Sequence, residues 1–426
     1  MAAQTVRWEG RDMPVSEAAS AMLSLSIKKR GQLNDLLMEA YQKASYFAES
    51  EINAIYSDKQ VNDELRKFKK PYEATVMSYE NDLASVENLV ATVTKHFDAS
   101  HDFYRLKARM LGQKQLSYAD RSANVGTTSK KISFDEAVLI IKKSFGEADQ
   151  EFSDIFERML REGRIDVYPR KGKRGGAYCS DGAEVPTVVL LNYNPSMDAV
   201  MTLAHEMGHA IHSELSRPVD PIYGGYSTSV AEVASTFFEN IAFEEMLQTL
   251  TEKEKVIALH DRVQDYITTA YRQIACFNFE LDLHTEIRRK GALSAAEIGA
   301  IHNRNMSAYL GPVVKMKEPD GNMFVAWSHI RNFFYVYSYS YGILISNALY
   351  KKYKEDKTYI HKIKEFMKEG GSMTPEEIFK SIGIDTSKPA FFEEGLMNIK
   401  EEIQRLKKII AESEKEKGKK ARIGAK

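Results

Sequence analysis

The chain has 426 residues, of which 43% are hydrophobic and 28% are charged, and its formal net charge is −1. This is the composition of an ordinary globular protein with a large core, and the length alone allows two or three domains. A charge so close to zero gives no overall field that would favour nucleic acid or an anionic membrane. We therefore expect neither as a partner.

The sequence shows no sign of export. Residues 1–14 lack the apolar core of a secretory signal, and no stretch approaches the ~20 apolar residues of a membrane span. Two cysteines, Cys179 and Cys276, do not make a disulfide framework, so a reducing compartment is the simpler interpretation. We expect a soluble, cytoplasmic protein, while its oligomeric state stays unknown.

Hydrophobic periodicity predicts that most of the chain is helical, because apolar residues recur at spacings of three and four. Residues 1–14 suggest an irregular lead-in, and residues 113–132 are polar and turn-rich, which predicts a long loop. Ser133 and Glu136 form a capping box that would start a helix. Apart from the stretch that contains the histidines described below, the predicted helices cover roughly residues 14–57, 60–98, 100–112, 133–163, 230–247, 251–290, 294–309, 324–353, 357–369, 374–381 and 388–411.

Residues 164–193 are short of helix formers. The β-rich run 187–193 lies between Pro186 and Pro195, and residues 177–179 could form a second short strand. We expect a small sheet here, directly before the next helix. Its exposed edge could hold an extended peptide by main-chain hydrogen bonds, or the strands could merely pack beneath that helix.

The next helix, DAVMTLAHEMGHAIH, contains the pattern H-E-x-x-H as His205, Glu206 and His209. Histidines four residues apart lie on one face of a helix, so two imidazoles can bind one zinc ion. The glutamate then lies beside the metal position left for water. Helix propensity does not explain Gly208, which indicates close packing against a neighbour or the metal. The alternative is an accidental spacing of two core histidines.

Catalytic zinc needs three protein ligands and one open position. Glu232 lies on the next predicted helix, and the intervening loop has two prolines and a Gly-Gly pair that can reverse the chain. We therefore predict Glu232 as the third ligand. Glu214, Asp220 or a later histidine remain alternatives, although Glu214 would point off the metal face.

Two more carboxylates could orient a zinc-binding histidine from behind. Glu239 lies seven residues beyond Glu232 on the same helix face, and Asp198 lies seven residues before His205. The alternatives are an exposed helical glutamate and an acidic residue favoured by the helix dipole.

A later segment, WSHIRNFFYVYSYSYG, carries His329 and four tyrosines. On a helix Tyr335 and Tyr339 share one face, as do Tyr337 and Tyr341. Phenol or imidazole donors aimed at the oxyanion of peptide hydrolysis are worth about 3 kcal/mol each. The alternative is an aromatic packing stripe.

These motifs together resemble a known family. HEMGH, AEVAST with Glu232 at that distance, and HIRNFFYVYSYSYG closely resemble the oligoendopeptidase F and thimet oligopeptidase family of zinc metallopeptidases. DVYPRKGKRGGAYCS and PAFFEEGLMNIKEEIQRL resemble its oligoendopeptidase F branch. The resemblance covers nearly the whole chain. Family members carry a longer N-terminal helical region, so this chain would begin inside that region, and the width of the channel stays open.

The resemblance implies a mainly α, multi-helical gluzincin-type fold with a deep substrate channel and one small β-sheet next to the zinc helix. It implies one zinc ion per chain and short peptide substrates. Carried over by motif, the metal ligands are His205, His209 and Glu232, the catalytic residues are Glu206, Tyr339 and His329, and the substrate-binding residues are Tyr335, Gly176 and Ala177.

We therefore expect a zinc-dependent endopeptidase that hydrolyses internal bonds of short oligopeptides. Zinc would acidify its bound water and polarise the carbonyl, while Glu206 takes the water proton and delivers it to the leaving amine. Two alternatives stay open. One is a zinc carboxypeptidase of similar helical architecture, with Arg331 capturing the C-terminal carboxylate. The other is a non-catalytic, zinc-stabilised peptide-binding protein.

We expect three regions along the chain. Residues 1–112 would form a helical part of a channel wall, and residues 113–411 the catalytic domain. Residues 412–426 are charged and poor in apolar side chains, which predicts a disordered tail.

Overall fold

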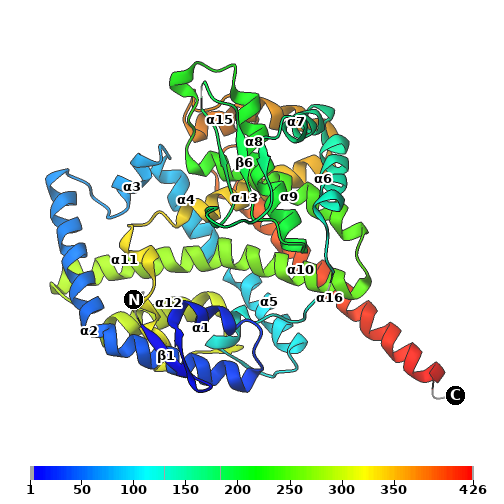
Figure 1. Cartoon of the computed structure of the whole chain (residues 1–426). Helices are drawn as coiled ribbons and strands as arrows, with labels where there is room; N and C mark the ends of the chain where they lie inside the picture. Colours follow the sequence, from blue (N-terminus) through cyan, green and yellow to red (C-terminus); the bar gives the residue numbers. More distant parts are fainter. Residues whose placement is uncertain (1–3, 129, 183, 425–426) are drawn as a thin grey trace. The chain divides into compact units, whose positions relative to one another are not determined.

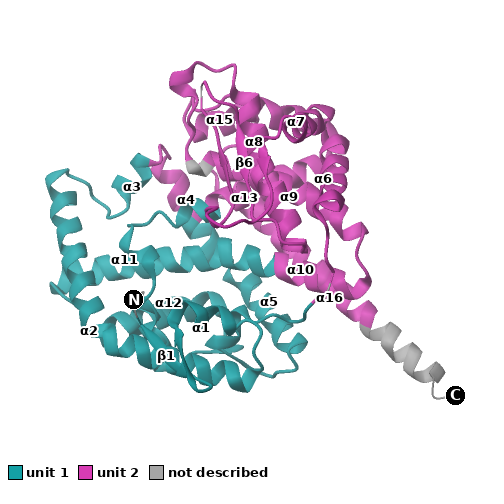
Figure 2. Ribbon diagram, viewed as in Figure 1, with its two compact units in different colours: residues 1–78, 90–127, 263–340 teal, residues 79–89, 128–262, 341–426 magenta. Residues whose placement is uncertain are grey.

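The computed structural model describes residues 4–128, 130–182 and 184–424, and in the last range it describes no side chains for residues 228, 229 and 414–424. The fold is mainly α, as predicted (Figure 1). The chain forms two compact units, each assembled from three segments that are far apart in sequence (Figure 2). No helix among the described residues is long and apolar enough to cross a membrane.

The first unit comprises residues 1–78, 90–127 and 263–340. Its elements are β1 (Thr5–Trp8), β2 (Arg11–Pro14), α1 (Val15–Ala21), α2 (Ile27–Leu65), α3 (Glu73–Ser78), α5 (Phe97–Met110), β3 (Leu116–Ser117), η1 (Tyr118–Ser122), the π-helical turn η3 (Ile267–Arg272), α11 (Gln273–Lys290), α12 (Ala295–Leu310), β7 (Val314–Lys315), η4 (Glu318–Val325) and η5 (Ser328–Arg331). Helices α2, α11 and α12 contact one another around a buried apolar core.

The structure corrects three expectations for this unit. Residues 5–14 form an antiparallel hairpin where an irregular lead-in was expected. The expected loop 113–132 contains β3, which pairs in parallel with β7, and the short helix η1. The expected helix 324–353 is interrupted, because η4, η5 and a turn with positive φ at Phe333 and Phe334 precede its helical part. The hairpin is a local pairing of adjacent strands, whereas the β3–β7 pair and the turn at Phe333 and Phe334 depend on contacts with distant parts of the chain.

The second unit comprises residues 79–89, 128–262 and 341–426. Its elements are α6 (Phe134–Ala148), α7 (Gln150–Arg161), β4 (Ile165–Asp166), β5 (Tyr178–Ser180), β6 (Val188–Leu190), α8 (Met197–Ser216), η2 (Pro221–Tyr223), α9 (Thr228–Gln248), η6 (Lys357–Tyr359), α14 (Ile360–Lys368), α15 (Pro375–Ser381) and α16 (Pro389–Gly424). Three further helices continue along the chain from one unit into the other: α4 (Leu83–Lys95), α10 (Glu252–Tyr266) and α13 (Tyr337–Glu355).

The core of the second unit lies between α6, α7, α8 and α9. Phe238 of α9 packs edge-on against Phe145 and Phe152, with ring centroids 4.7 and 4.9 Å apart. The Ser133 capping box is present, as predicted. The expected helix 133–163 is two helices, because Asp149 ends α6 and caps α7 by accepting a hydrogen bond from the backbone of Glu151.

A three-stranded sheet in this unit has the order β4-β6-β5. Strand β6 is central, pairing in parallel with β4 and antiparallel with β5, so β5 is an edge strand. Both β5 and β6 contact α8, which confirms the small sheet expected beside the histidine helix. Strand β4 was not expected. The deep channel and the division at residues 112 and 411 stay predictions, and the tail 412–426 lies largely outside the residues with described side chains.

Candidate metal centre

Helix α8 presents the H-E-x-x-H pattern from a well-defined start. Ser196 caps it by accepting a hydrogen bond from the backbone N–H of Ala199 at 3.1 Å. Val200, Leu203 and Met207 are fully buried, so the apolar face of α8 packs into the core and fixes the rotation of the helix. His205 and His209 then come to one face, with their Nε2 atoms 3.1 Å apart.

Helix α9 approaches α8 closely at Gly208. A β-carbon at this position would lie 2.6 Å from the Cα of Ser235 and 3.1 Å from the ring of Phe238. Only glycine allows this approach, which is the close packing that the sequence indicated. It brings Glu232, on the first turns of α9, to the two imidazoles.

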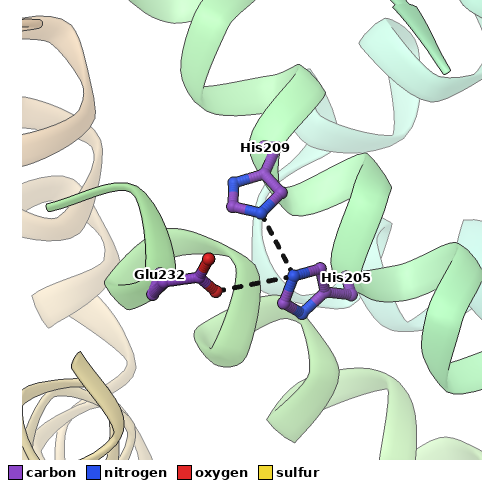
Figure 3. Close-up of side chains that lie close together, drawn as sticks. All are labelled: His205, His209 and Glu232. Atoms are coloured by element: carbon purple, nitrogen blue, oxygen red, sulfur yellow. Dashed lines mark hydrogen bonds and ion pairs between the residues drawn. The ribbon is translucent and has the colours of Figure 1, made fainter. Parts of the chain in front are cut away.

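His205, His209 and Glu232 form a group whose ligand atoms all lie within 4.8 Å of one another (Figure 3). A carboxylate oxygen of Glu232 lies 3.5 Å from Nε2 of His205. Ligands bound tetrahedrally at about 2.0–2.2 Å from zinc lie about 3.3–3.6 Å apart. The His205–Glu232 separation of 3.5 Å lies in this range and the His205–His209 separation of 3.1 Å is slightly below it, so the three groups could hold a zinc ion after small adjustments.

The group is open on one side. The side chain of His205 is 28% exposed to solvent, and that of Glu232 is 34% exposed. Structural zinc sites are closed by four protein ligands, whereas catalytic sites leave one position for water or substrate. Among the described residues, no further histidine, cysteine, aspartate or glutamate joins the three.

Glu239 supports His205 from behind. Its carboxylate, about two helical turns beyond Glu232 on α9, contacts Nδ1 of the imidazole. This contact keeps a proton on Nδ1 and leaves the lone pair of Nε2 for a metal. Asp198, the other residue predicted to orient a zinc-binding histidine, is exposed on the first turn of α8. Of the two predicted carboxylates, Glu239 is the one that contacts His205.

The surrounding carboxylates favour positive charge. Burial alone would lower the pKa of His205, but Glu239, Glu232 and Glu206 outweigh it and raise the pKa to about 9. Burial, and then the charge of His205, lower the pKa of His209 to about 3. Without a metal, His205 is thus the charged imidazole near neutral pH and His209 is the neutral one, and the carboxylates that favour this charge would also stabilise a bound dication.

Glu206 lies beside the ligands and is buried. Burial raises its pKa, opposed by the charge of His205, and the backbone N–H of Cys179 donates a hydrogen bond to it. A raised pKa suits a carboxylate that must accept and then release a proton near neutral pH. Cys179 belongs to the edge strand β5, so this strand touches the candidate general base directly.

An apolar hollow of about 280 Å³ opens beside this strand. The side-chain amide of Asn192 holds one wall by donating to the carbonyls of Arg174 and Gly176, both at 2.9 Å. The hollow is lined by Gly176, Ala177, Leu191, Asn192, Tyr193, Ala199 and Thr202. Two of the predicted substrate-binding residues, Gly176 and Ala177, therefore form part of its wall.

The predicted histidine–tyrosine cluster lies in the first unit. The hydroxyl of Tyr335 hydrogen-bonds Nδ1 of His329. The ring of Tyr339 lies 5.8 Å from that of Tyr335 and 6.2 Å from that of His329. Tyr339 is 38% exposed, whereas Tyr337 and Tyr341 are fully buried, so only one of the two predicted pairs is accessible.

The alternative third ligands are engaged elsewhere. Glu214 accepts hydrogen bonds from Thr187 at 2.7 Å and Arg158 at 2.7 Å. Asp220 caps η2 by accepting from a backbone N–H, and His212 stacks on Tyr226. Burial would raise the pKa of Glu214, but hydrogen bonds from Thr187 and two arginines lower it to about 2.

Two contributors were missed in the sequence. Ser235 donates to Glu232 Oε2 at 3.1 Å, one helical turn away, and also packs against Gly208. A serine at this spacing inside an apolar helix is a signal that could have been used. The backbone N–H of Cys179 gives no signal in the sequence, because any residue except proline supplies one.

Comparison with known proteins places the chain in a family. The sequence profile of peptidase family M3 matches residues 23–398. The chain belongs to peptidase family M3. Relatives of this M3 chain include Oligopeptidase PepF of Bacillus subtilis, 28% identical over 81% of this chain and 52% of that protein. An oligoendopeptidase F homolog of Borreliella burgdorferi is 30% identical over 88% of this chain and 65% of that protein. The M3 chain thus spans about half to two thirds of the length of these relatives.

Solved structures share the fold of this M3 chain. Oligoendopeptidase-F from Enterococcus faecium superposes with a TM-score of 0.75 at 20% identity, over 96% of this chain and 69% of that one. A Chlamydophila abortus protein superposes with a TM-score of 0.88 at 25% identity, over 95% and 69% of the two chains.

Proposed function

We propose that this M3 chain is a zinc-dependent endopeptidase that hydrolyses internal bonds of short oligopeptides. The observation that carries the proposal is the position of Glu206, a buried carboxylate that directly follows His205 on α8 and interacts electrostatically with His205 and Glu232 of the ligand group. A purely structural zinc site has no use for such a base. The names of the relatives, oligopeptidase and oligoendopeptidase, support the same substrate class.

A zinc ion held by His205, His209 and Glu232 would polarise the scissile carbonyl and acidify the attacking water. The carboxylate of Glu206 accepts the proton of that water and passes it to the nitrogen of the leaving amine. Burial and the N–H of Cys179 hold this carboxylate in place. The carboxylate of Glu239 accepts a hydrogen bond from Nδ1–H of His205 and so keeps the imidazole proton on that nitrogen.

His329 and Tyr339 are assigned as donors to the oxyanion of the tetrahedral intermediate, and Tyr335 as a substrate-binding residue. The hydroxyl of Tyr335 hydrogen-bonds Nδ1 of His329. In the proposed tautomer the hydroxyl donates to Nδ1, so that the proton of the imidazole is on Nε2 and this nitrogen can act as a donor. Burial lowers the pKa of His329, so the imidazole is neutral near pH 7 and donates without carrying charge. Each donor is expected to contribute about 3 kcal/mol.

The edge strand β5 is the proposed binding strand for substrate. Its inner neighbour β6 uses one edge of β5, and an extended peptide would add along the other. Gly176 and Ala177 lie immediately before the strand and line the apolar hollow. An apolar side chain of the peptide would fill that hollow while its main chain pairs with the strand.

The carboxypeptidase alternative requires Arg331 to bind the C-terminal carboxylate of a substrate, but this arginine is already engaged. Arg331 forms an ion pair with Glu51, with its Nε and Nη2 atoms 3.0 and 2.7 Å from one carboxylate oxygen. Its Nη1 atom donates to the carbonyls of Phe324 and Trp327. All three guanidinium nitrogens of this arginine are hydrogen-bonded within the first unit, so they are not available to bind a C-terminal carboxylate.

A quenched fluorescent peptide capped at both ends tests the proposal. An endopeptidase cuts it, a carboxypeptidase does not, and a zinc-stabilised binding protein binds it without cleavage. We expect cleavage that stops with a chelator and returns with added zinc. Binding without cleavage by the zinc-loaded chain would overturn the proposal.

We also assign the protein to the cytoplasm. Both cysteines are free, and Cys276 is fully buried, as expected in a reducing compartment.

A further inference from the structure

The two halves of the histidine–tyrosine cluster are joined by an unusual turn. His329 lies on one side of it, in η5, and Tyr335 lies directly after it. The two residues of the turn, Phe333 and Phe334, have φ angles of 44° and 64°. Residues with a β-carbon rarely adopt this left-handed conformation, and two in succession without glycine need support from their surroundings.

The support comes from three other segments of the first unit. Thr75 Oγ1 donates to the carbonyl of Phe333 at 2.8 Å. The hydroxyl of Tyr56, on α2, donates to the carbonyl of Ile330 at 2.9 Å. The backbone N–H of Phe334 donates to Glu280 Oε2 at 2.9 Å, and this last contact comes from α11.

Glu280 is the anchor that packing alone does not explain. Its side chain is fully buried, and its second oxygen, Oε1, has no hydrogen-bond partner among the described residues. A buried carboxyl with half of its hydrogen-bonding capacity unused is costly, and an apolar residue would fill the same space more cheaply. What the carboxyl supplies is the acceptor for Phe334.

One turn further along α11, His284 packs against the same turn. Its ring stacks between Tyr56 and Phe334, with centroids 4.0 and 5.1 Å away. Glu280 and His284 therefore hold the backbone and the ring of the same residue from one helix face. Lys59 is the cation that acts electrostatically on Glu280, and it is itself paired with Asp63.

We propose that Glu280 is a positioning residue that holds the left-handed Phe333–Phe334 turn and thereby sets Tyr335 and Tyr339 against His329. The catalytic consequence rests on the proposed function, in which this cluster stabilises the oxyanion. Without the acceptor, the buried N–H of Phe334 is unsatisfied and the turn relaxes toward an ordinary conformation. The hydroxyl of Tyr335 then leaves Nδ1 of His329.

The test compares two substitutions of the same residue. Glu280→Gln keeps a carbonyl acceptor for Phe334, whereas Glu280→Leu keeps the volume and loses the acceptor. Activity is measured on the capped quenched peptide with zinc-loaded protein. The hydrogen bond of Nδ1 of His329 is followed by the 15N chemical shift of this nitrogen in protein labelled with 15N-histidine. The signal is assigned as the one that disappears in His329→Ala.

Glu280→Gln should keep kcat within about twofold of the parent and leave the Nδ1 signal in place. Glu280→Leu should lower kcat at least tenfold with KM within about twofold, and should shift the signal. Glu286→Leu, at a half-buried position of α11 whose carboxylate pairs with Arg289, should change neither. Thr75→Val removes the hydrogen bond to the carbonyl of Phe333 and should shift the Nδ1 signal in the same direction. This variant therefore tests the role of the turn even if Glu280→Leu does not fold.

A second substitution probes the strain directly. Glycine adopts positive φ freely, so Phe333→Gly should make the turn less dependent on its anchor. The loss caused by Glu280→Leu should therefore be smaller in the Phe333→Gly background than in the parent. Equal losses in both backgrounds would mean that Glu280 does not act through the turn.

The outcomes separate the two proposals. An unmoved Nδ1 signal in Glu280→Leu, or a Glu280→Gln variant as impaired as Glu280→Leu, would overturn the positioning role. A shifted signal with unchanged kcat would uphold the positioning of His329 and overturn the catalytic role of the cluster. Absence of cleavage by the parent chain would overturn the proposed function, while the signal would still test the turn.

Discussion

Gly208 of α8 faces Ser235 of α9 so closely that a β-carbon on the glycine would lie 2.6 Å from the Cα of the serine. The obstacle is backbone, which cannot move aside as a flexible side chain would. This contact sets the distance between the helix that carries His205 and His209 and the helix that carries Glu232. One missing β-carbon thus fixes the width of the candidate metal centre.

Gly208→Ala should therefore push α9 away. We expect a loss of about 1–3 kcal/mol in the free energy of unfolding from overpacking, and weaker zinc binding because Glu232 moves with the helix. Denaturant unfolding and zinc titration measure the two effects. The matched control is Gly146→Ala inside α6, where the nearest atom to a new β-carbon is 3.5 Å away. That substitution should stabilise by about 0.5–1 kcal/mol, and similar behaviour of the two variants would contradict the argument.

Glu206→Gln should keep zinc and lose most activity. The amide occupies the same space and can still accept the hydrogen bond from Cys179, but it cannot take a proton from water. Removing a general acid–base group lowers kcat by about 10²–10⁴-fold. Zinc content is measured by metal analysis and turnover with the capped peptide. Near-normal turnover in a zinc-loaded variant would remove Glu206 from the mechanism.

Glu239→Gln tests the support behind His205. The amide can still accept a hydrogen bond from Nδ1–H, but it no longer contributes the negative charge that makes the imidazole a stronger ligand, so zinc affinity should fall by about 10–100-fold. Competition with a chromophoric chelator gives the affinity. Asp198→Asn is the control, because this exposed carboxylate sits at the start of the same helix as the ligands. Equal losses in both variants would point to a general effect of charge.

The metal centre was predictable from the sequence because local rules build most of it. The four-residue spacing of His205 and His209 and the seven-residue spacing of Glu232 and Glu239 acquire their meaning once both segments are helices. Gly208 signalled the close approach of a neighbour. Each inference needed only the period of a helix and one reversal of the chain between two helices.

The parts that could not be predicted are set by distant contacts. Strand β4 has two residues and exists because β6 pairs with it. The two residues with positive φ, Phe333 and Phe334, are phenylalanines and not the glycine or asparagine that would predict such a turn, and their conformation is supported by Thr75 and Glu280. Helical periodicity was therefore assumed across this turn. Tyr335 and Tyr339 lie close together, as their spacing indicated, but the turn is what places His329 beside them.

Glu280 should make stability depend on pH. Burial raises its pKa to about 8 from an ordinary value of 4.5, opposed by the backbone hydrogen bond of Phe334 and by Lys59. Between these two values the folded state holds a proton that the unfolded state has lost. The free energy of unfolding therefore falls as pH rises through this window, by at most about 1.4 kcal/mol per pH unit from this group.

Glu280→Gln removes that titration. The stability of this variant relative to the parent should rise between pH 5 and 8 and then level off, as measured by reversible denaturant unfolding. Glu286→Gln is the control, because the hydrogen bond from Arg289 lowers the pKa of that half-buried carboxyl. It should show no such rise, and a flat difference for Glu280→Gln would mean that Glu280 is ionised in the folded state.

The apolar hollow beside β5 should set a side-chain preference. Ala199 lies in its wall on the first turn of α8, so Ala199→Phe fills the space with an aromatic ring. Substrates that place a large apolar side chain in the hollow should lose about 10–200-fold in kcat/KM, because one pocket contact is worth that range. Peptides with glycine or alanine at the same position should lose much less. The control is Leu139→Phe, an exposed position on α6, which should leave the preference unchanged. A uniform loss across a library of capped peptides would place the substrate side chain elsewhere and leave Gly176 and Ala177 without a role in selecting it.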